Sequence, residues 1–448
     1  MPFILLLAVL GGLAFRLTSP DDRARYLARA KGALLRLRVA AADPGPEYEL
    51  FHTALGVRTR HTFVAPAIVA LNVAVFGGML FGTGALSDPN TLVAWGGNLG
   101  ARTTNGEWWR LLTSSFLHLG VLHLLVDAAV LIQLGSVLER LVGRPAFAAV
   151  YLSAGVFAGL VNISAHPVDV TVGVSGAIFG LYGLLLAVLA WQVLERRDAD
   201  SESGVDPYAE PAVDQRAAAR VTIPLVSMIK LAIGGAVFIL YSALGGFASA
   251  AELAGLAGGI GYGLVLARGV SDREPEANQV GAIFAAACAI AITCALPLRN
   301  IADVKPEITG VLATEERTVL VFQTAHQAFK TGRMTAEGLA RIAERTIVAQ
   351  LQAADRRLEV LRNVPVENRP IVTDAREYLR LRTQSWRARA EAIRSANIDP
   401  TASANGAADA HSRLRAEARF RSNLAAMGNA ETAERASLEA FARIAQPR

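Results

Sequence analysis

Long apolar runs are concentrated between residues 62 and 298 of the chain. A helix needs about 20 mostly apolar residues to cross a bilayer, with a lower limit near 17. Seven runs reach or approach this length and predict membrane-spanning helices: 62–83, 115–135, 146–164, 174–193, 222–243, 248–267 and 280–297. The hydrophobic pattern therefore predicts an all-α polytopic membrane protein.

The residues on either side of these runs are more polar, with one exception at the N-terminus. Residues 2–15 form a short apolar run, which we interpret as a membrane anchor within residues 1–16. We do not expect a cleaved signal peptide, because no basic residues precede the run and no clear cleavage site follows it. Residues 17–61 form a basic segment. Residues 299–448 show apolar positions at helical spacing, interrupted by prolines, and predict a soluble helical tail.

The distribution of arginine and lysine predicts the orientation in the membrane. Seventeen basic residues fall in the segments on one side of the seven runs, against Arg102 and Arg110 on the other. Because basic segments stay in the cytoplasm, the loop 84–114 and the tail are expected to face outward. We therefore expect an integral protein of a bacterial inner or plasma membrane, with cytoplasmic basic loops and the lipid bilayer as a partner.

Composition narrows the range of partners. The chain is 52% hydrophobic and carries a formal net charge of +5, an excess that in a membrane protein reflects topology and lipid contact. No phosphate-binding glycine loop or RNA-binding motif is present in the sequence, so we expect no nucleic acid as a partner. No motif predicts a cofactor or a metal site. Cys288 and Cys294 lie in one apolar run and are expected to pack there without forming a disulfide.

Three of the predicted spans carry polar residues that a simple anchor would not tolerate. The stretch SFLHLGVLHLLVD contains His118, His123 and Asp127, GVSGAIFG contains Ser175, and ASAAELAGLAGG contains Glu252. A charged group in the bilayer is costly, so an acid inside a span indicates a functional site. All three segments lie at the predicted outer ends of their helices. One water-accessible pocket could therefore hold them together.

The chemistry of these residues has both a functional and a structural interpretation. Ser175 is expected at a helix N-terminus, where free backbone N–H groups can face a developing oxyanion. The same small-residue pattern is also common as a packing contact between membrane helices. His123 and Asp127 are four residues apart and so share a helix face. The histidines could equally be interfacial groups bonded to backbone carbonyls, but their convergence with a serine and acids favours a site.

The order and spacing of these motifs resemble the rhomboid family of intramembrane serine proteases over about residues 60–270. The resemblance rests on the stretches GEWWRLLTSSFLHLGVLHLLVD, LGSVLERLVGRPAFAAVYLSAGV, GVSGAIFG and ELAGLAGG. It implies a six-helix core over residues 62–270, followed here by an additional transmembrane helix within residues 271–298. It also implies a serine–histidine dyad that cleaves transmembrane helices near their outer ends.

The resemblance assigns roles to individual residues. Ser175 takes the position of the nucleophile, and His123 and Asp127 take those of a histidine and an asparagine that help to hold the oxyanion. Phe179 takes the place of an aromatic ring behind the catalytic histidine. Arg110 and Glu139 would order the outer loop and a helix connection. The other implied site-lining and structural residues are Gly173, Gly176, His118, Trp109, Gly255 and Gly259.

The sequence departs from the family pattern at two of these positions. Glu252 stands where the family has its catalytic histidine, and Asp127 replaces the oxyanion asparagine. A carboxylate can accept the serine proton, but it must then be ionised in a low-dielectric pocket. An ionised Asp127 would repel the oxyanion, and the loss of one donor alone costs about 10²–10³ in rate. His166, nine residues before Ser175, could replace the missing base, although its position before a proline indicates a turn.

Two functions therefore remain open on the sequence alone. The two substitutions favour a pseudoprotease, which keeps the rhomboid groove and binds transmembrane helices without cutting them. The alternative is an active intramembrane serine protease that uses a Ser175–Glu252 pair. In both cases the expected substrates or clients are transmembrane helices. The tail is expected to be an interaction module for another protein.

Overall fold

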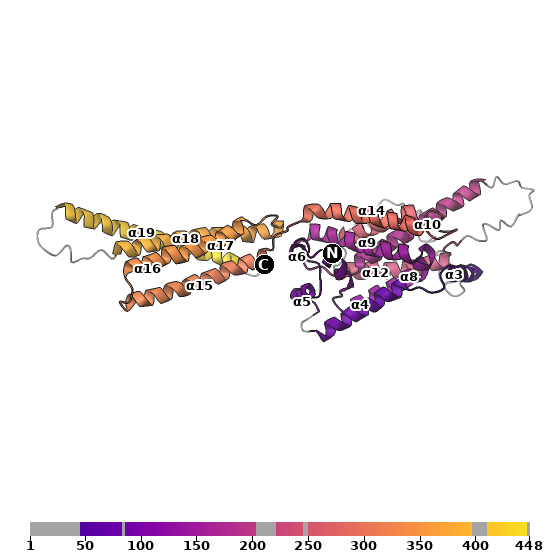
Figure 1. The fold of residues 1–448 in the computed structure, drawn as a ribbon, viewed down its shortest axis with the longest axis horizontal. Coiled ribbons are helices and arrows are strands. Elements are labelled where there is room, and N and C mark those ends of the chain that lie inside the picture. Colours follow the sequence, from indigo (N-terminus) through magenta and orange to yellow (C-terminus); the bar gives the residue numbers. More distant parts are fainter. Residues whose placement is uncertain (1–44, 83–85, 203–220, 245–249, 397–409, 446–448) are drawn as a thin grey trace, which may run out of the picture. The chain divides into compact units, whose positions relative to one another are not determined.

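The computed structural model describes residues 45–82, 86–202, 221–244, 250–396 and 410–445 (Figure 1). The chain divides into two compact units after Arg299, which we call the membrane unit and the tail unit. The expected N-terminal anchor, residues 2–15, and most of the basic segment lie outside the described residues. Within the basic segment the structure adds a helix that the sequence did not predict, α3 (Gly45–Arg58).

The membrane unit is built mainly from apolar helices (Figure 1). Six helices among the described residues are long and apolar enough to cross a membrane. They are α4 (Val64–Phe81), α8 (Val121–Val142), α9 (Arg144–Ala165), α10 (Ser175–Glu202), α12 (Leu225–Leu244) and α14 (Ala277–Ala295). The predicted span 248–267 corresponds to α13 (Ala250–Leu266), a shorter apolar helix of 17 residues. The protein is thus an all-helical integral membrane protein.

Helix α8 begins later than the sequence pattern predicted. The expected span began at residue 115, but residues Ser114–Phe116 form a 3₁₀ turn, and Gly120, just before the helix, has an extended backbone. The apolar residues in this stretch serve a loop instead, because Leu117 is buried against Met79 and Leu92. Hydrophobicity alone could not distinguish this buried loop from the first turns of the helix.

The segment between α4 and α8 carries three short helices, α5 (Pro89–Ala94), α6 (Gly100–Thr103) and α7 (Arg110–Thr113). Helix α10 continues beyond the predicted span 174–193 as far as Glu202, and residues 203–220 are not described. Cys288 and Cys294 are exposed on α14. Both cysteines are free, as the sequence predicted, but the packing expected for them is not seen.

The two ends of the membrane unit differ in their polar contacts. At the end where α8 stops, the Glu139 carboxylate accepts the backbone N–H groups of Phe63, Val64 and Ala65 at 2.5–2.9 Å. These donors belong to the first turn of α4, which has no intrahelical partners for them. At the same end, the Arg58 guanidinium donates to the carbonyls of Val270 and Ser271, both at 2.6 Å. These contacts fix this end of the bundle, opposite the end where Ser175 lies.

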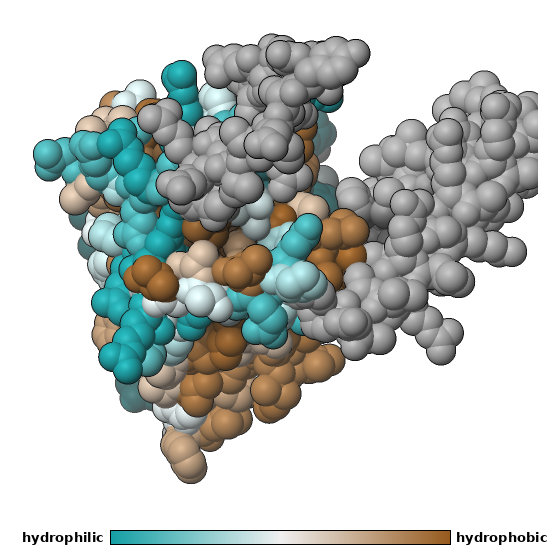
Figure 2. Space-filling view, turned by 90° about the vertical axis from the view of Figure 1, so that its right-hand side faces the viewer, coloured by the Kyte–Doolittle hydropathy of each residue, from teal (hydrophilic) through white to brown (hydrophobic). Residues whose placement is uncertain are grey.

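The outer surface of the spanning helices is largely apolar. In Figure 2, hydrophilic residues gather over part of the surface and a broad hydrophobic area lies beside them. The exposed large apolar side chains of the spans include Leu71, Leu80, Leu125, Ile132, Leu186, Ile233, Leu240 and Ile290. A soluble protein rarely exposes so large a contiguous apolar surface. Lipid tails would cover it in a bilayer.

The tail unit is a bundle of helices: α15 (Val304–Lys330), α16 (Ala336–Ile342), α17 (Ala349–Glu359), α18 (Arg369–Ala396) and α19 (Ala410–Ala445). A π-helical turn, Ala343–Val348, joins α16 to α17. The core of the tail unit contains Leu351, Tyr378 and Trp386, all nearly fully buried. The helical tail expected from the sequence is therefore confirmed.

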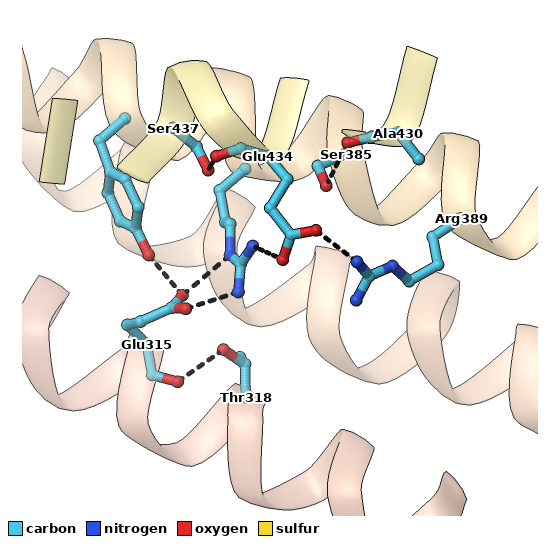
Figure 3. Close-up of polar contacts among 9 residues, drawn as sticks. Glu315, Thr318, Ser385, Arg389, Ala430, Glu434 and Ser437 are labelled. Atoms are coloured by element: carbon cyan, nitrogen blue, oxygen red, sulfur yellow. Dashed lines mark hydrogen bonds and ion pairs between the residues drawn. The ribbon is translucent and has the colours of Figure 1, made fainter. Parts of the chain in front are cut away.

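A buried arginine joins three helices of the tail unit. The Arg382 guanidinium on α18 lies 2.7 Å from a carboxylate oxygen of Glu315 on α15 and 3.1 Å from one of Glu434 on α19. Figure 3 shows that Glu434 also contacts Arg389. The Glu315 carboxylate also accepts a hydrogen bond from the hydroxyl of Tyr378. Every buried charge in this network therefore has an opposite charge within reach.

Candidate active site

A cavity of about 370 Å³ opens at the end of the membrane unit where α8, α10 and α13 begin. Three of the residues singled out in the sequence, Ser175, Glu252 and His123, line it together. The remaining lining residues are Asn98, Ser114, Ser115, Leu119, Gly155, Ala158, Gly159, Asn162, His166, Asp169, Val170, Thr171, Val172, Gly173, Gly176 and Ala251. The polar segments of three predicted spans thus meet in one place.

Ser175 and Glu252 are in direct contact in this cavity. The Ser175 hydroxyl donates a hydrogen bond to Oε1 of Glu252, with 3.1 Å between the oxygens. Ser175 is the first residue of α10, and Glu252 lies in the first turn of α13, where it is 6% exposed. The distance is within the range of a nucleophile and its general base.

The backbone before Ser175 is shaped by a glycine. Gly173 has a φ of 118°, a value that residues with a side chain rarely adopt. Its N–H donates to the carbonyl of Ser114 at 2.9 Å, which ties the segment before α10 to the turn before α8. Ser175 then begins a helix whose first N–H groups have no intrahelical acceptors. These groups, together with the positive end of the helix dipole, suit a negatively charged oxygen near the serine.

Close packing of α10 against α13 sets the distance between the two residues. A Cβ atom on Gly255 would lie 2.1 Å from the carbonyl oxygen of Gly176, and one on Gly259 would lie 1.8 Å from that of Gly180. Only glycine permits two helix backbones to approach this closely. We call these four glycines the α10–α13 seam. The expected roles of Gly176, Gly255 and Gly259 thus have a physical basis in helix packing.

Asp127 is placed between two histidines and not beside the serine. Its Oδ2 atom lies 3.2 Å from Nε2 of His123 and 3.3 Å from Nε2 of His118. Both Asp127 and His118 are almost completely buried and lie outside the cavity lining. His123 separates them from the cavity, where an added Cβ on Gly173 would meet its ring at 3.3 Å. Asp127 therefore does not line the cavity itself, and the His123 ring lies between its carboxylate and an oxyanion at Ser175.

The loop over the cavity is held by Arg110. The guanidinium is 3% exposed and donates from Nη1 to the carbonyls of Val93 and Gly97 at 2.6 and 3.1 Å. It also lies 4.6 Å from the ring centre of Trp109, which is half exposed. This loop meets the segment before Ser175 through backbone hydrogen bonds between Asn98 and Thr171, at 2.8 and 2.9 Å.

Phe179 and Glu139, which were also named from the resemblance, lie away from the cavity. Phe179 packs against Phe238 of α12, with 5.2 Å between the ring centres. Glu139 lies at the opposite end of the bundle, where it caps α4. His166 does line the cavity, and its side chain is 54% exposed near Asp169, at 3.9 Å. In the part of the chain that the structure describes, no three His, Cys, Asp or Glu side chains are arranged to hold a metal ion.

Several cavity residues were not recognised in the sequence. Asn162 near the end of α9 and the loop residues Asn98, Ser114 and Ser115 all line the cavity. Asn162 could have been found, because it is a polar residue inside the predicted span 146–164. The loop residues carried no such signal, since polar residues are ordinary in loops.

Part of this chain is similar to a known family. A family model described as the rhomboid domain matches residues 105–269, a range that contains Ser175, Glu252, His123 and Asp127. Residues 105–269 are thus similar to a rhomboid domain. Helices α8, α9, α10, α12 and α13 lie within the matched range, α4 precedes it and α14 follows it.

Individual relatives share only part of this chain. Rhomboid protease GluP of Bacillus subtilis is 38% identical over 120 residues, which are 27% of this chain and 23% of the relative. Rhomboid-like protease 2 of Toxoplasma gondii is 35% identical over 114 residues, 25% of this chain and 40% of the relative. Inactive RHOMBOID-like protein 8 of Arabidopsis thaliana is 34% identical over 90 residues, 20% of this chain and 26% of the relative. The chain thus spans less than half the length of each.

Proposed function

We propose that this chain is an intramembrane serine endopeptidase in which Ser175 is the nucleophile and Glu252 the general base. The observation that carries the proposal is the 3.1 Å hydrogen bond from the Ser175 hydroxyl to the Glu252 carboxylate inside the cavity. A substrate would be a transmembrane helix, cut near the end of the bundle at which the cavity opens. The rhomboid domain and the apolar spans support this substrate class.

The geometry allows a complete reaction cycle with these two residues. The Ser175 oxygen attacks the carbonyl carbon of the scissile peptide bond while its proton passes to Glu252. The resulting oxyanion lies near the N-terminus of α10, and the protonated Glu252 then gives its proton to the leaving nitrogen. In the second half, Glu252 removes a proton from the water that attacks the acyl-enzyme, and it then gives this proton to the Ser175 oxygen as the acyl bond breaks. Each half of the cycle thus returns the carboxyl group to its ionised state.

The position of Asp127 supports activity more than the sequence suggested. One of the two substitutions that favoured a pseudoprotease was Asp127, because an ionised carboxylate there would repel the oxyanion. Asp127 instead lies behind His123 and within 3.3 Å of two imidazoles. Its negative charge therefore has partners that can balance it. This leaves the weak basicity of Glu252 as the main obstacle.

A second candidate function is the binding of transmembrane helices without cleavage. It is favoured by the carboxylate at the position where the family resemblance places a histidine, since removing a triad base costs several orders of magnitude in rate. One relative is itself described as an inactive rhomboid-like protein. In this case the cavity would accommodate an unwound client helix and hold it uncut.

We also propose the orientation that the basic residues indicate. The end with α3 and Arg58 would face the cytoplasm of a bacterial cell, and the cavity would open on the outer side. The tail unit would follow α14 on that outer side and bind another protein there. A protease added to one side of sealed vesicles would test this, because only one end should be digested.

The test is cleavage of a transmembrane substrate in membranes by the native protein and two variants. We expect cutting to vanish in Ser175→Ala and to fall at least about 10³-fold in Glu252→Gln, because glutamine cannot accept the proton. Glu276→Gln is the matched control, since Glu276 is an exposed glutamate outside the cavity that pairs with Arg273. It should cut at the native rate.

Each outcome has a distinct meaning. Unchanged cutting in Glu252→Gln would show that another group is the base, and a further loss in His166→Gln would identify it. The absence of cutting by the native protein, with the substrate still bound to it, would favour the second candidate function. Labelling of Ser175 by a fluorophosphonate probe reports the activated serine without any substrate.

A further inference from the structure

The His118–Asp127–His123 cluster lies directly behind the cavity wall. One carboxylate oxygen of Asp127 is 3.2 Å from His123 and 3.3 Å from His118, and the two rings meet edge to face with 5.2 Å between their centres. His118 is fully buried, and Asp127 is 1% exposed. A buried carboxylate is costly without a cation beside it. The arrangement therefore favours a proton on one of the imidazoles.

We propose that Asp127 holds His123 in its protonated form, so that an imidazolium faces the oxyanion formed at Ser175. This rests on the proposed function, because it assigns the oxyanion side of the same reaction. Of the three cluster residues, only His123 lines the cavity. It is the residue that can touch the reacting atoms. Asp127 and His118 are positioning residues that act through it.

A protonated His123 would stabilise the oxyanion through its positive charge, which a neutral hydrogen-bond donor does not supply. Preorganised positive charge beside a developing oxyanion is a large source of transition-state stabilisation in a site that excludes water. An imidazolium at His123 would also balance the negative charge of Asp127, which otherwise would disfavour the oxyanion. The replacement of a neutral amide by an acid at position 127 is then compensated by one additional proton on the cluster.

The reaction consequently requires two opposite protonation states in one cavity. Glu252 must be ionised to accept the serine proton, and the histidine cluster must be protonated to hold the oxyanion. The other titratable groups that face Asp127 are Tyr151 of α9 and Tyr241 of α12, and a phenol ordinarily titrates only at about pH 10. The cavity itself adds His166 and Asp169 at its mouth. We expect a bell-shaped pH profile with its maximum on the acid side of neutrality.

The sign of the pH dependence follows from these states. As the pH falls, protonation of Glu252 removes the base, which gives the acid limb of the profile. As the pH rises, the cluster loses its proton and the oxyanion loses its positive partner, which gives the alkaline limb. The two limbs are macroscopic properties of the coupled groups.

The experiment is the pH profile of kcat for cleavage by the native protein and four variants. In Asp127→Asn, the imidazolium loses its counter-charge, so the alkaline limb should move to lower pH by about one unit or more. In His123→Gln, the alkaline limb should disappear, and the maximal kcat should fall about 10²–10³-fold. His118→Gln leaves Asp127 beside His123, at 3.2 Å, and should therefore retain most of the native alkaline limb.

The matched control is Asp169→Asn, which removes an exposed carboxylate from the cavity mouth. The Asp169 side chain is 66% exposed, so water and salt should screen its effect on the alkaline limb. A shift as large as that of Asp127→Asn would overturn the proposal. An alkaline limb that stays in place in Asp127→Asn, or moves to higher pH, would also overturn it, because Asp127 would then not hold the proton on His123.

A second measurement separates this proposal from the proposed function. The Ser175→Ala protein cannot cut, yet NMR of its labelled histidine rings still follows their protonation with pH. We expect the rings of His118 and His123 to titrate together, and at lower pH in Ser175→Ala/Asp127→Asn than in Ser175→Ala. This result would support the proposal that Asp127 holds the proton on His123, even if the native protein cuts nothing. If the histidine titration curves are the same in Ser175→Ala and in Ser175→Ala/Asp127→Asn, the proposal is overturned, whether or not the native protein is a protease.

Discussion

In the membrane unit, α10 and α13 meet at four glycines, and no side chain separates their backbones. In the tail unit, α15, α18 and α19 meet instead around the buried guanidinium of Arg382. The first contact depends on shape, since it is lost as soon as a Cβ atom is added. The second depends on charge, since it is lost as soon as one partner is removed.

The same contrast applies to the buried ionisable groups. In the tail, the cations are arginines, which stay charged over the whole physiological pH range. In and behind the cavity wall, Glu252 contacts a serine and Asp127 lies beside two histidines, whose side chains gain and lose protons near neutral pH. A fixed network suits a structural role, whereas a network of exchangeable protons suits a reaction.

The largest effect is expected from filling the α10–α13 seam. In Gly259→Leu the new side chain would collide with the backbone of Gly180, because even its Cβ would lie 1.8 Å from the carbonyl oxygen. We expect a loss of about 3 kcal/mol or more in stability, together with loss of Ser175 labelling by a fluorophosphonate probe. Thermal unfolding in detergent measures the first effect and gel fluorescence the second.

The control for this change lies two residues away on the same helix. Gly261 has open space around its Cα, so Gly261→Ala should leave both readouts close to native. If Gly259→Leu folded and labelled normally, the two helices would not depend on the seam for their distance. The contrast between the two units would then not hold.

A smaller effect is expected from removing the buried charge of the tail. Arg382→Ala would leave Glu315 and Glu434 without their shared cation, at a cost of about 2–3 kcal/mol. Hydrogen exchange of residues 369–396 in the full-length protein should increase, whereas Ser175 labelling should not change. Arg376→Ala is the control, because its side chain is 41% exposed and its pairs with Asp355 and Glu359 are screened by water. Equal exchange in the two variants would contradict the role of Arg382.

The smallest effect is a pH dependence at the edge of the tail unit. Two hydrogen bonds from the Arg394 guanidinium, at 2.6 and 2.7 Å, hold the pKa of Glu344 below its usual value. A carboxyl group with a lowered folded-state pKa stabilises the fold above its unfolded pKa, and this stability is lost as the pH falls through the folded pKa. Protection of residues 336–348 from hydrogen exchange should therefore decrease in acid.

Arg394→Gln should remove most of this acid dependence, because glutamine cannot supply the cationic pair. A pH dependence that is the same in Arg394→Gln would assign it to other carboxyl groups of the tail. The membrane unit should behave differently, since its proposed pH response appears in the rate of cleavage and not in the stability.

The sequence predicted the features that depend on a local pattern of residues, namely apolar runs and the polar residues inside them. Apolar runs identified the spanning helices, and polar residues inside them identified Ser175, His123 and Glu252, which the structure brings into one cavity. The sequence could not place Asp127 behind His123. Spacing along α8 puts the two residues on one face but does not give the depth of either side chain relative to the cavity.

Other features depend on contacts between distant parts of the chain. Glu315, Arg382 and Glu434 are far apart in sequence, and each is an ordinary charged residue of a polar helix. Nothing in their local pattern distinguished them from solvent-exposed charges. The start of α8 was also missed, because a buried loop and a buried helix turn require the same apolar residues.

The cap formed by Glu139 has a consequence for how the membrane unit can move. Its carboxylate, which is fully buried, fastens the first turn of α4 to α8 at the end of the bundle away from the cavity. Any tilt of one helix against the other therefore pivots about that point. Displacement grows with distance from a pivot, so it is greatest at the end where His123 and Ser175 lie. A transmembrane segment that enters from the bilayer would meet the bundle where it can open most and disturb its anchored end least.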